Sequence, residues 1–311
     1  DGEGHPICCE LWPGNTADVE TLIPEVERLR RRFGIGAVCI VADRGMISKE
    51  TIEKLESMSP AVFYILGVRM RKRKEVREEV LRDEGEYVEV FGQRQKSKDP
   101  SPLKVKEVWV EDRRYIECYN AEQARKDAAS RQAILEALEE KLKRGDKILI
   151  GNKGYRRYLK IPEKGGHFTI DEEKAQEEER FDGLWVLRTN TELPTEEVAL
   201  KYKQLWMVEH VFRSVKSMLR TRPVYHKYDA TIRGHVFCSF LALILVKELQ
   251  SQLEARGLKL EWKDVLRDLE KLQEIEVDFG TQRFFLRTEL RGNCVDVLRA
   301  VGVRIPSAVT Q

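Results

Sequence analysis

Two apolar runs with a short helical stretch between them constrain the fold more than any other feature of the sequence. Residues 37–43 and 61–69 lack the alternation of a half-exposed strand, so each is predicted as a strand buried on both faces. Residues 49–58 between them are predicted as a helix, with Ser48 as its N-cap and Pro60 just beyond its end. Strand, helix and strand in this order are typical of an α/β layer.

The segments before and after these runs indicate an interrupted layer. Residues 6–12 are predicted as a short strand, followed by a turn and a helix that Gly34 closes. After residue 69 the chain becomes rich in charge and turns, and 103–120 alternate like a hairpin. Asn120 is predicted to cap a helix that ends at Gly145, and further strands follow. This stretch has the pattern of a mixed, strand-rich insertion.

The last third of the chain is mainly helical in pattern. Thr195, after a proline and before two glutamates, is predicted to begin a long helix that stops near Pro223. A second helix is predicted from about Ala230 to Ala255. The predicted parts are a first part of an α/β core (1–69), a strand-rich insertion (70–192), a second part of the core (193–255) and a C-terminal tail (256–311).

Composition limits the partners and the compartment. Charged residues make up 35% of the chain but nearly balance, at +2, so a nucleic-acid surface requires local clustering. The densest basic run is 69–77; it is either a DNA-backbone contact or a solvated helix start. None of the six cysteines forms a C-x-x-C pair, which favours buried thiols in a reducing, cytoplasmic compartment over a disulfide frame or a zinc site. The apolar run 236–246 is predicted as a buried helix, too short to span a bilayer.

The stretch YKQLWMVEHVFRSVK (202–216) carries two stripes when it is wound as a helix. One stripe is apolar and is predicted to face the core: Leu205, Val208, Phe212, Val215 and Leu219. The other falls within about 40° of one direction at 3.6 residues per turn. It consists of Tyr202, Trp206, Glu209, Arg213 and Lys216. This second stripe is either a functional face or a solvated flank with a Glu209–Arg213 ion pair.

Two carboxylates give the functional alternative its chemistry. Asp43 ends a predicted buried strand, at the sheet edge where α/β layers bind ligands, although a strand-end aspartate also caps turns. If the helix packs on the sheet through its apolar stripe, Glu209 could face the same edge. Paired carboxylates suit Mg²⁺ or Mn²⁺ and two-metal phosphoryl transfer. Arg213 and Lys216 would then hold phosphates, and Tyr202 and Trp206 would contact bases or sugars.

These residues resemble a known signature. Tyr202, Glu209 and Lys216 have the spacing of the Y-x2-R-x3-E-x6-K signature of DDE transposases of the insertion-sequence-four superfamily. VADRG (41–45) resembles the segment that carries the second aspartate of these enzymes. FDGLWVLRTN (181–190) and RPVYHKYDATIRGHVFCSFLAL (222–243) also resemble segments of that family. The similarity covers most of residues 1–250.

The resemblance implies a fold and an activity. The expected fold is an RNase H-like core with a β-rich insertion, and the expected reaction is Mg²⁺-dependent cut-and-paste DNA transposition. It further implies a homodimer on paired transposon ends and a cytoplasmic, nucleoid-associated protein in a prokaryote. Asp43 and Glu209 are the expected catalytic metal ligands. Trp185 matches a tryptophan that stacks on a flipped base in hairpin-forming relatives, although core packing explains it equally well. The expected DNA contacts are Tyr202, Lys216, Arg213, Trp206, Trp185, Arg44, Arg71, Lys72 and Arg73.

The sequence departs from the signature in two places. Leu205 stands where the signature has arginine, so Lys203 or Arg213 would have to supply that contact. The first aspartate of the triad is expected on a strand before residue 1, and the chain alone is therefore expected to be inactive. Two other functions stay open: an inactive remnant that still binds transposon ends, and an RNase H-like nuclease.

Overall fold

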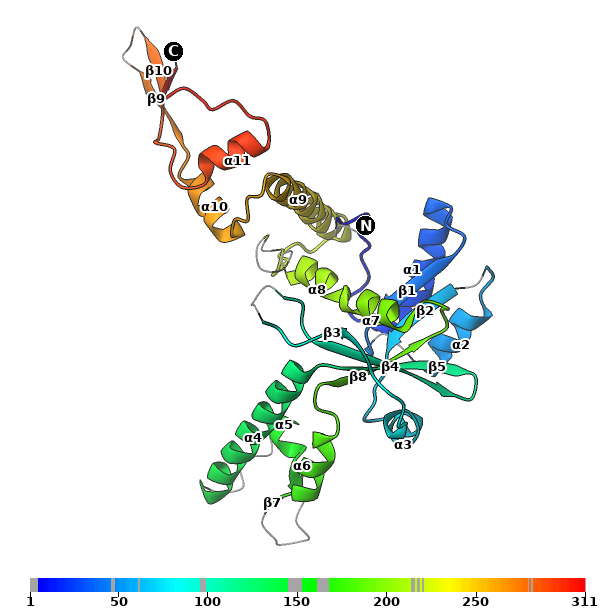
Figure 1. The fold of residues 1–311 in the computed structure, drawn as a ribbon. Coiled ribbons are helices and arrows are strands. Elements are labelled where there is room, and N and C mark those ends of the chain that lie inside the picture. The colour runs from blue at the N-terminus through cyan, green and yellow to red at the C-terminus, as the bar shows by residue number, and fades with distance from the viewer. Residues whose placement is uncertain are drawn as a thin grey trace. The chain divides into compact units, whose positions relative to one another are not determined.

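A computed structural model of the chain describes residues 5–45, 48–60, 62–95, 99–144, 153–160, 168–213, 216, 219, 221–278, 280 and 282–310. The chain forms two compact units, one of Pro13–Leu205 and one that joins Asp1–Trp12 to Trp206–Gln311. The predicted mixed α/β class is confirmed (Figure 1).

A six-stranded sheet organises the unit Pro13–Leu205, with the strand order β1-β2-β8-β5-β4-β3. Its strands are β1 (Val38–Ala42), β2 (Val62–Gly67), β3 (Val88–Phe91), β4 (Leu103–Val110), β5 (Arg113–Tyr119) and β8 (Leu184–Thr189). β1 and β2 are parallel, and the other neighbours pair antiparallel. The strands predicted on either side of residue 69 therefore belong to one continuous sheet.

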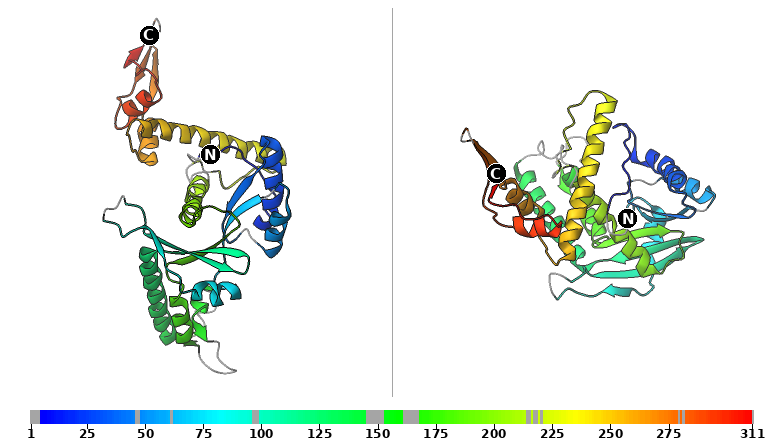
Figure 2. Two further views of the ribbon diagram at one scale, coloured as in Figure 1. Left: turned by 45° about the vertical axis from the view of Figure 1, so that its right-hand side comes forward. Right: turned by 90° about the horizontal axis from the view of Figure 1, so that it is seen from above.

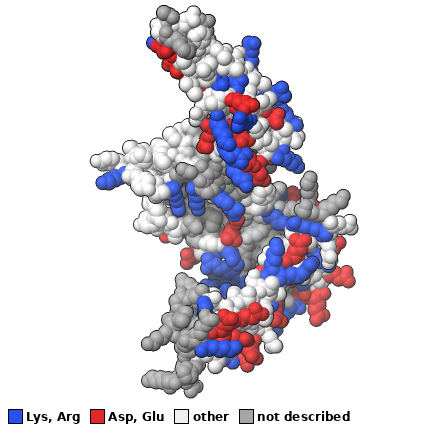
Figure 3. All heavy atoms as spheres, turned by 90° about the vertical axis from the view of Figure 1, so that its left-hand side faces the viewer, with Lys and Arg blue, Asp and Glu red and all other residues white. Residues whose placement is uncertain are grey.

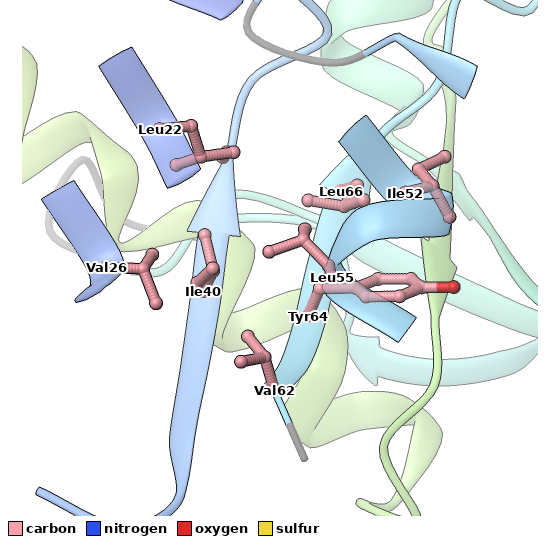
Figure 4. Packing of buried hydrophobic residues seen from close by; sticks show 9 residues of the cluster. Leu22, Val26, Ile40, Ile52, Leu55, Val62, Tyr64 and Leu66 are labelled. Carbon is pink, nitrogen blue, oxygen red and sulfur yellow. The ribbon is translucent and has the colours of Figure 1, made fainter. Parts of the chain in front are cut away.

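Two helices and the parallel strand pair enclose the first core cluster. The helices are α1 (Asp18–Phe33) and α2 (Lys49–Ser57). Figure 4 shows their apolar side chains against those of β1 and β2, with Leu55 completely buried. The predicted ends of these helices are confirmed: Gly34 takes the left-handed conformation after α1, and the Ser48 hydroxyl accepts the Thr51 N–H at the start of α2.

α7 (Thr195–Lys203) packs on the face of the sheet opposite to α1 and α2, where it lies against β1, β2, β4 and β5. Val198 and Ala199 are completely buried in the second cluster, together with Ile65, Ile116 and Leu187. Figure 1 shows α7 running across the strands. Tyr202 lies one turn after Val198 and Ala199 on the same helical face, and it packs against the same cluster.

The rest of the predicted insertion forms a helical lobe beside the sheet. α4 (Ala121–Arg144) begins at Asn120, whose side-chain oxygen accepts the N–H groups of Glu122 and Gln123, as predicted. The lobe also contains α5 (Lys153–Arg156), β6 (Leu159–Lys160), β7 (Thr169–Ile170) and α6 (Glu172–Glu179). Leu138, Tyr158 and Ala175 form its core, and Figure 2 shows α4 beside α6. The short segments α3 (Lys74–Glu78) and η1 (Val80–Arg82) cover the sheet near β4 and β5.

The second unit contains a long helix and a small C-terminal module. Its elements are α8 (Leu205–Arg213, whose first residue belongs to the other unit), α9 (Asp229–Ala255), α10 (Trp262–Glu270), β9 (Glu274–Asp278), β10 (Arg283–Arg287), α11 (Cys294–Ala300) and β11 (Val309–Thr310). β9, β10 and β11 form one antiparallel sheet. Leu253, Val265 and Val297 bury the contact of α9 with α10 and α11.

Several sequence predictions differ from the structure. Residues 6–12 form no regular strand, and the helix predicted from Thr195 to near Pro223 is interrupted at Gln204, between α7 and α8. The predicted division into parts stays a prediction. Its boundaries after 69 and 192 lie inside the unit Pro13–Leu205, whose sheet contains strands from both sides of residue 69, and its boundary after 255 lies inside the other unit. The predicted helix end at Gly145 and the position of Val215 lie outside the described residues.

The prediction that 236–246 forms a helix is confirmed, but the prediction that this helix is buried is wrong. These residues lie within α9, where Phe237, Leu241 and Leu245 are exposed. α9 is long and apolar enough to cross a bilayer by length and composition, a test that core helices of soluble proteins pass as well. Only a few positions of α9, such as Leu243, Val246 and Leu253, are buried.

Candidate active site

Asp43 lies at the carboxyl edge of the parallel strand pair, as predicted. It directly follows β1, and the last paired residues of β1 and β2 are Ala42 and Leu66. Asp43 and Gly67 therefore leave the two strands side by side. The Asp43 side chain is exposed, and the hydroxyl of Ser48 caps α2 without it. The turn-capping alternative for Asp43 thus has no support among the described contacts.

Tyr202 makes the one hydrogen bond that Asp43 accepts among the described residues. The Tyr202 hydroxyl donates to Asp43 Oδ1 over 3.0 Å. Burial and the nearby Asp43 carboxylate both raise the pKa of Tyr202, so the phenol stays protonated and keeps its donor at neutral pH. The bond joins residues 159 positions apart in the sequence and fixes the end of α7 on the edge that holds Asp43.

Glu209 lies on α8 in the other unit. Its side chain is exposed and has no hydrogen bond or ion pair among the described residues, so the Glu209–Arg213 pair of the solvated-flank alternative is not formed. The apolar stripe predicted to face the core is largely uncovered, because Val208 is 49% and Phe212 57% exposed. Trp206 is also exposed. The polar and the apolar stripe of α8 are therefore both accessible.

Glu209 and three residues that follow it line one hollow of about 560 Å³. These three residues are Phe212, Arg213 and Lys216. The Lys216 ammonium lies 6.0 Å from the centre of the Phe212 ring, at the outer limit of a cation–π contact. The predicted stripe is thus divided. Tyr202 binds Asp43 in one unit, whereas Glu209, Arg213 and Lys216 share a hollow in the other.

The predicted basic contacts near the sheet occupy different environments. Arg44 is exposed beside Asp43, and Lys72 and Arg73 are exposed in the turn before α3. Arg71 instead donates to the buried carboxylate of Glu178 over 2.7 Å, and its guanidinium lies over the Phe181 ring. Arg71 therefore joins the core edge to α6. Its availability for DNA is reduced, because Glu178 neutralises its charge.

Two arginines near Arg44 and Arg71 were not predicted as site residues. Arg131 lies on α4 and Arg157 directly follows α5, and both line a hollow of about 280 Å³ together with Arg44 and Arg71. Arg131 is held bidentately by Asp182, and Arg157 reaches Glu178. These pairs form only through the tertiary fold. On the face drawn in Figure 3, Lys and Arg are interspersed with Asp and Glu.

Trp185 and Lys203 are partly buried. Trp185 packs against the second core cluster, and its buried indole N–H has no hydrogen-bond partner among the described atoms, which is the core-packing alternative for this residue. The Lys203 ammonium lies over the Phe91 ring, and burial lowers its pKa. The exposed indoles are those of Trp109 and Trp206.

Divalent metals are bound by several carboxylate or imidazole side chains that converge on one point. No three His, Cys, Asp or Glu side chains within the described residues form a metal-binding group. Asp43 and Glu209 are nevertheless exposed carboxylates, and neither is neutralised by an ion pair among the described residues. Hard oxygen ligands of this kind fit Mg²⁺ or Mn²⁺.

Comparison with known proteins agrees with this chemistry. The family described as "Transposase DDE domain" matches residues 1–245. This match includes Asp43, Tyr202, Glu209 and Lys216, and it stops within α9. No curated protein matches the chain significantly.

Proposed function

Because the chain belongs to the transposase DDE-domain family, we propose that it catalyses cut-and-paste transposition with Asp43 and Glu209 as metal ligands. The family implies DNA binding and metal-dependent DNA cleavage in general. The observation that carries the assignment of residues is the hydrogen bond between Tyr202 and Asp43. It joins the strand-end segment VADRG to the tyrosine that begins the Tyr–Glu–Lys spacing, so two separately recognised segments meet at one atom pair.

The proposed chemistry is phosphoryl transfer. A water oxygen forms a bond to the scissile phosphorus while the bond from phosphorus to the 3′ oxygen breaks, which leaves a 3′-OH and a 5′-phosphate. The oxygen of this 3′-OH then forms a bond to the phosphorus of a second phosphodiester while the bond from that phosphorus to its own 3′ oxygen breaks, which releases a new 3′-OH. Bound Mg²⁺ or Mn²⁺ would stabilise the charge on the attacking and leaving oxygens. Asp43 and Glu209 would supply the carboxylate oxygens that hold these ions.

The cations and the indole near Glu209 have the character of a DNA contact. Arg213 and Lys216 line the same hollow as Glu209 and would bind phosphates, while the exposed Trp206 would stack on a base or pack on a sugar. Arg44 would bind a phosphate next to Asp43. We further propose a homodimer on paired ends and association with the nucleoid.

The proposal includes a third acid. The DDE triad after which the family is named consists of two aspartates and one glutamate, and Asp43 and Glu209 would account for two of these three ligands.

Cleavage assays with Mg²⁺ or Mn²⁺ on transposon-end DNA test this proposal. Asp43→Ala or Glu209→Ala should reduce the rate of cleavage by about a thousandfold or more while DNA retention persists. Unchanged cleavage by either variant would contradict the ligand assignment.

A further inference from the structure

Gly67 occupies a point where no side chain fits. It is the last residue of β2 and pairs with Leu187 of β8, and it lies beside the exit of β1. A Cβ atom built on Gly67 would lie 2.4 Å from the Tyr202 hydroxyl oxygen, 3.1 Å from Tyr202 Cζ and 3.2 Å from the backbone nitrogen of Arg44. Real Cβ atoms essentially never approach another heavy atom within 3.0 Å. Any residue other than glycine would therefore force Tyr202 to move.

Backbone strain does not explain this glycine. Its φ is not in the left-handed region, which the chain uses at other glycines such as Gly34 and Gly183. Alanine could adopt the backbone of Gly67, and its closest conflict would be with the Tyr202 hydroxyl, ahead of the 3.2 Å approach to the Arg44 nitrogen. A glycine inside a strand often marks the close approach of another group, which here is the Tyr202 hydroxyl.

The phenol is held from its other side by the core. Val198 and Ala199, one turn earlier in α7, are completely buried, and the Tyr202 ring packs against the same cluster. Asp43 is exposed, so little else restricts the rotation of its carboxylate. A hydrogen bond from an anchored donor removes that freedom at Oδ1.

We propose that Tyr202 and Gly67 are positioning residues for Asp43. Tyr202 fixes one carboxylate oxygen so that the other is presented to the metal, and Gly67 leaves the space in which the phenol reaches it. The inference rests on the proposed role of Asp43 as a metal ligand. It gives Tyr202 a task other than the DNA contact expected from the sequence.

Binding of Mn²⁺ to the chain, followed by electron paramagnetic resonance of the free ion, tests the inference without cleavage. Groups that hydrogen-bond a ligating carboxylate typically contribute 10–100-fold to metal affinity. Tyr202→Phe should therefore weaken Mn²⁺ binding by about tenfold or more. Gly67→Ala should weaken it by a similar factor. Gly36→Ala is the matched control, because a Cβ there meets nothing within 4 Å.

The double variant separates positioning from general damage. Tyr202→Phe removes the hydroxyl oxygen that a Cβ at residue 67 would strike, which leaves the milder contacts of 3.1 Å with Cζ and 3.2 Å with the Arg44 nitrogen. Gly67→Ala in the Tyr202→Phe background should therefore cost little further affinity. An additive loss in the double variant would show that Gly67 acts independently of Tyr202 and would overturn the pairing.

Asp43→Asn distinguishes failure of this inference from failure of the proposed function. If Asp43→Asn leaves Mn²⁺ affinity unchanged, the metal role of Asp43 fails, and the positioning role fails with it. If Asp43→Asn weakens binding but Tyr202→Phe does not, only the positioning role fails. Should Gly67→Ala prevent folding, the comparison of Tyr202→Phe with Asp43→Asn still decides the question.

Discussion

Arg114 is the residue whose loss should most disturb the packing of α7 on the sheet. Its side chain is almost completely buried, and its guanidinium donates to the carbonyl oxygens of Thr191 and Leu193 over 2.7 and 2.8 Å. It also donates to Glu107 over 2.9 Å, and the Thr195 hydroxyl donates to the same carboxylate. Arg114 thus fixes the connection from β8 to α7, the helix that delivers Tyr202.

The expected loss of stability in an Arg114 variant depends on the groups that lose a hydrogen-bond partner. Arg114→Met keeps the apolar stem but leaves two carbonyl oxygens and Glu107 without the cation. Hydrogen bonds to a charged group contribute about 1.5–3 kcal/mol each, and the Glu107 contribution is smaller because this carboxylate is 36% exposed. The two carbonyl bonds alone therefore give an expected loss of about 3–6 kcal/mol in the free energy of unfolding. At about 2–4 °C per kcal/mol, Tm should fall by roughly 6–24 °C.

Arg113→Met is the matched control for this prediction. Arg113 is the adjacent residue, but its side chain is 28% exposed and pairs with Glu75 and Glu111 near the surface. Exposed pairs of this kind contribute about 1 kcal/mol or less. In thermal unfolding followed by circular dichroism, the Tm of Arg114→Met should therefore lie well below that of Arg113→Met. Equal Tm values for the two variants would refute the assignment of Arg114 as a buried connection.

Two further predictions concern the unit that contains α8. Trp206→Ala should weaken binding of transposon-end DNA about 5–150-fold in filter or anisotropy assays, because stacking on one base is worth about 1–3 kcal/mol. Trp109→Ala removes a similarly exposed indole and should have little effect. Equal losses would contradict a specific role for Trp206. The Asn293 backbone N–H donates to Asp268 and holds the pKa of this carboxyl below its usual value of 3.8. The stability that Asp268 contributes is therefore present above about pH 4, and it is lost as the pH falls through the lowered pKa. Hydrogen exchange at the Asn293 amide should accelerate in acid relative to the intrinsic rate, and Asp268→Asn should remove this dependence; an unchanged acid profile in the variant would contradict it.

The features that the sequence predicted well are those fixed by neighbours along the chain. The caps at Ser48 and Asn120 and the left-handed end at Gly34 need only a few adjacent residues, and all three are confirmed. The apolar runs that became β1 and β2 are equally local. The position of Asp43 at the strand end followed from these elements.

Contacts between segments far apart in the chain could not be predicted from local sequence patterns. β8 pairs with β2 across more than a hundred residues, and the Asn190 side chain completes the pairing with the Tyr64 N–H and the Val62 carbonyl. Nothing in the alternation of either strand specifies this partner. The insertion was therefore predicted as a separate part, although its strands extend the same sheet.

The predicted stripe is divided between α7 and α8 for a local reason. The residues just before Tyr202 indicate the face of the helix on which this tyrosine lies. Counted forward from Leu205, the apolar positions suggest that Tyr202 lies on a flank. Counted back from Tyr202, the residues three and four positions earlier are Ala199 and Val198, which place the tyrosine on the buried face of α7. The helix is interrupted at Gln204, so the facing of α7 does not carry over to α8. A tyrosine that packs on the sheet can reach Asp43 only if the edge beside it is free of side chains, and Gly67 meets that condition.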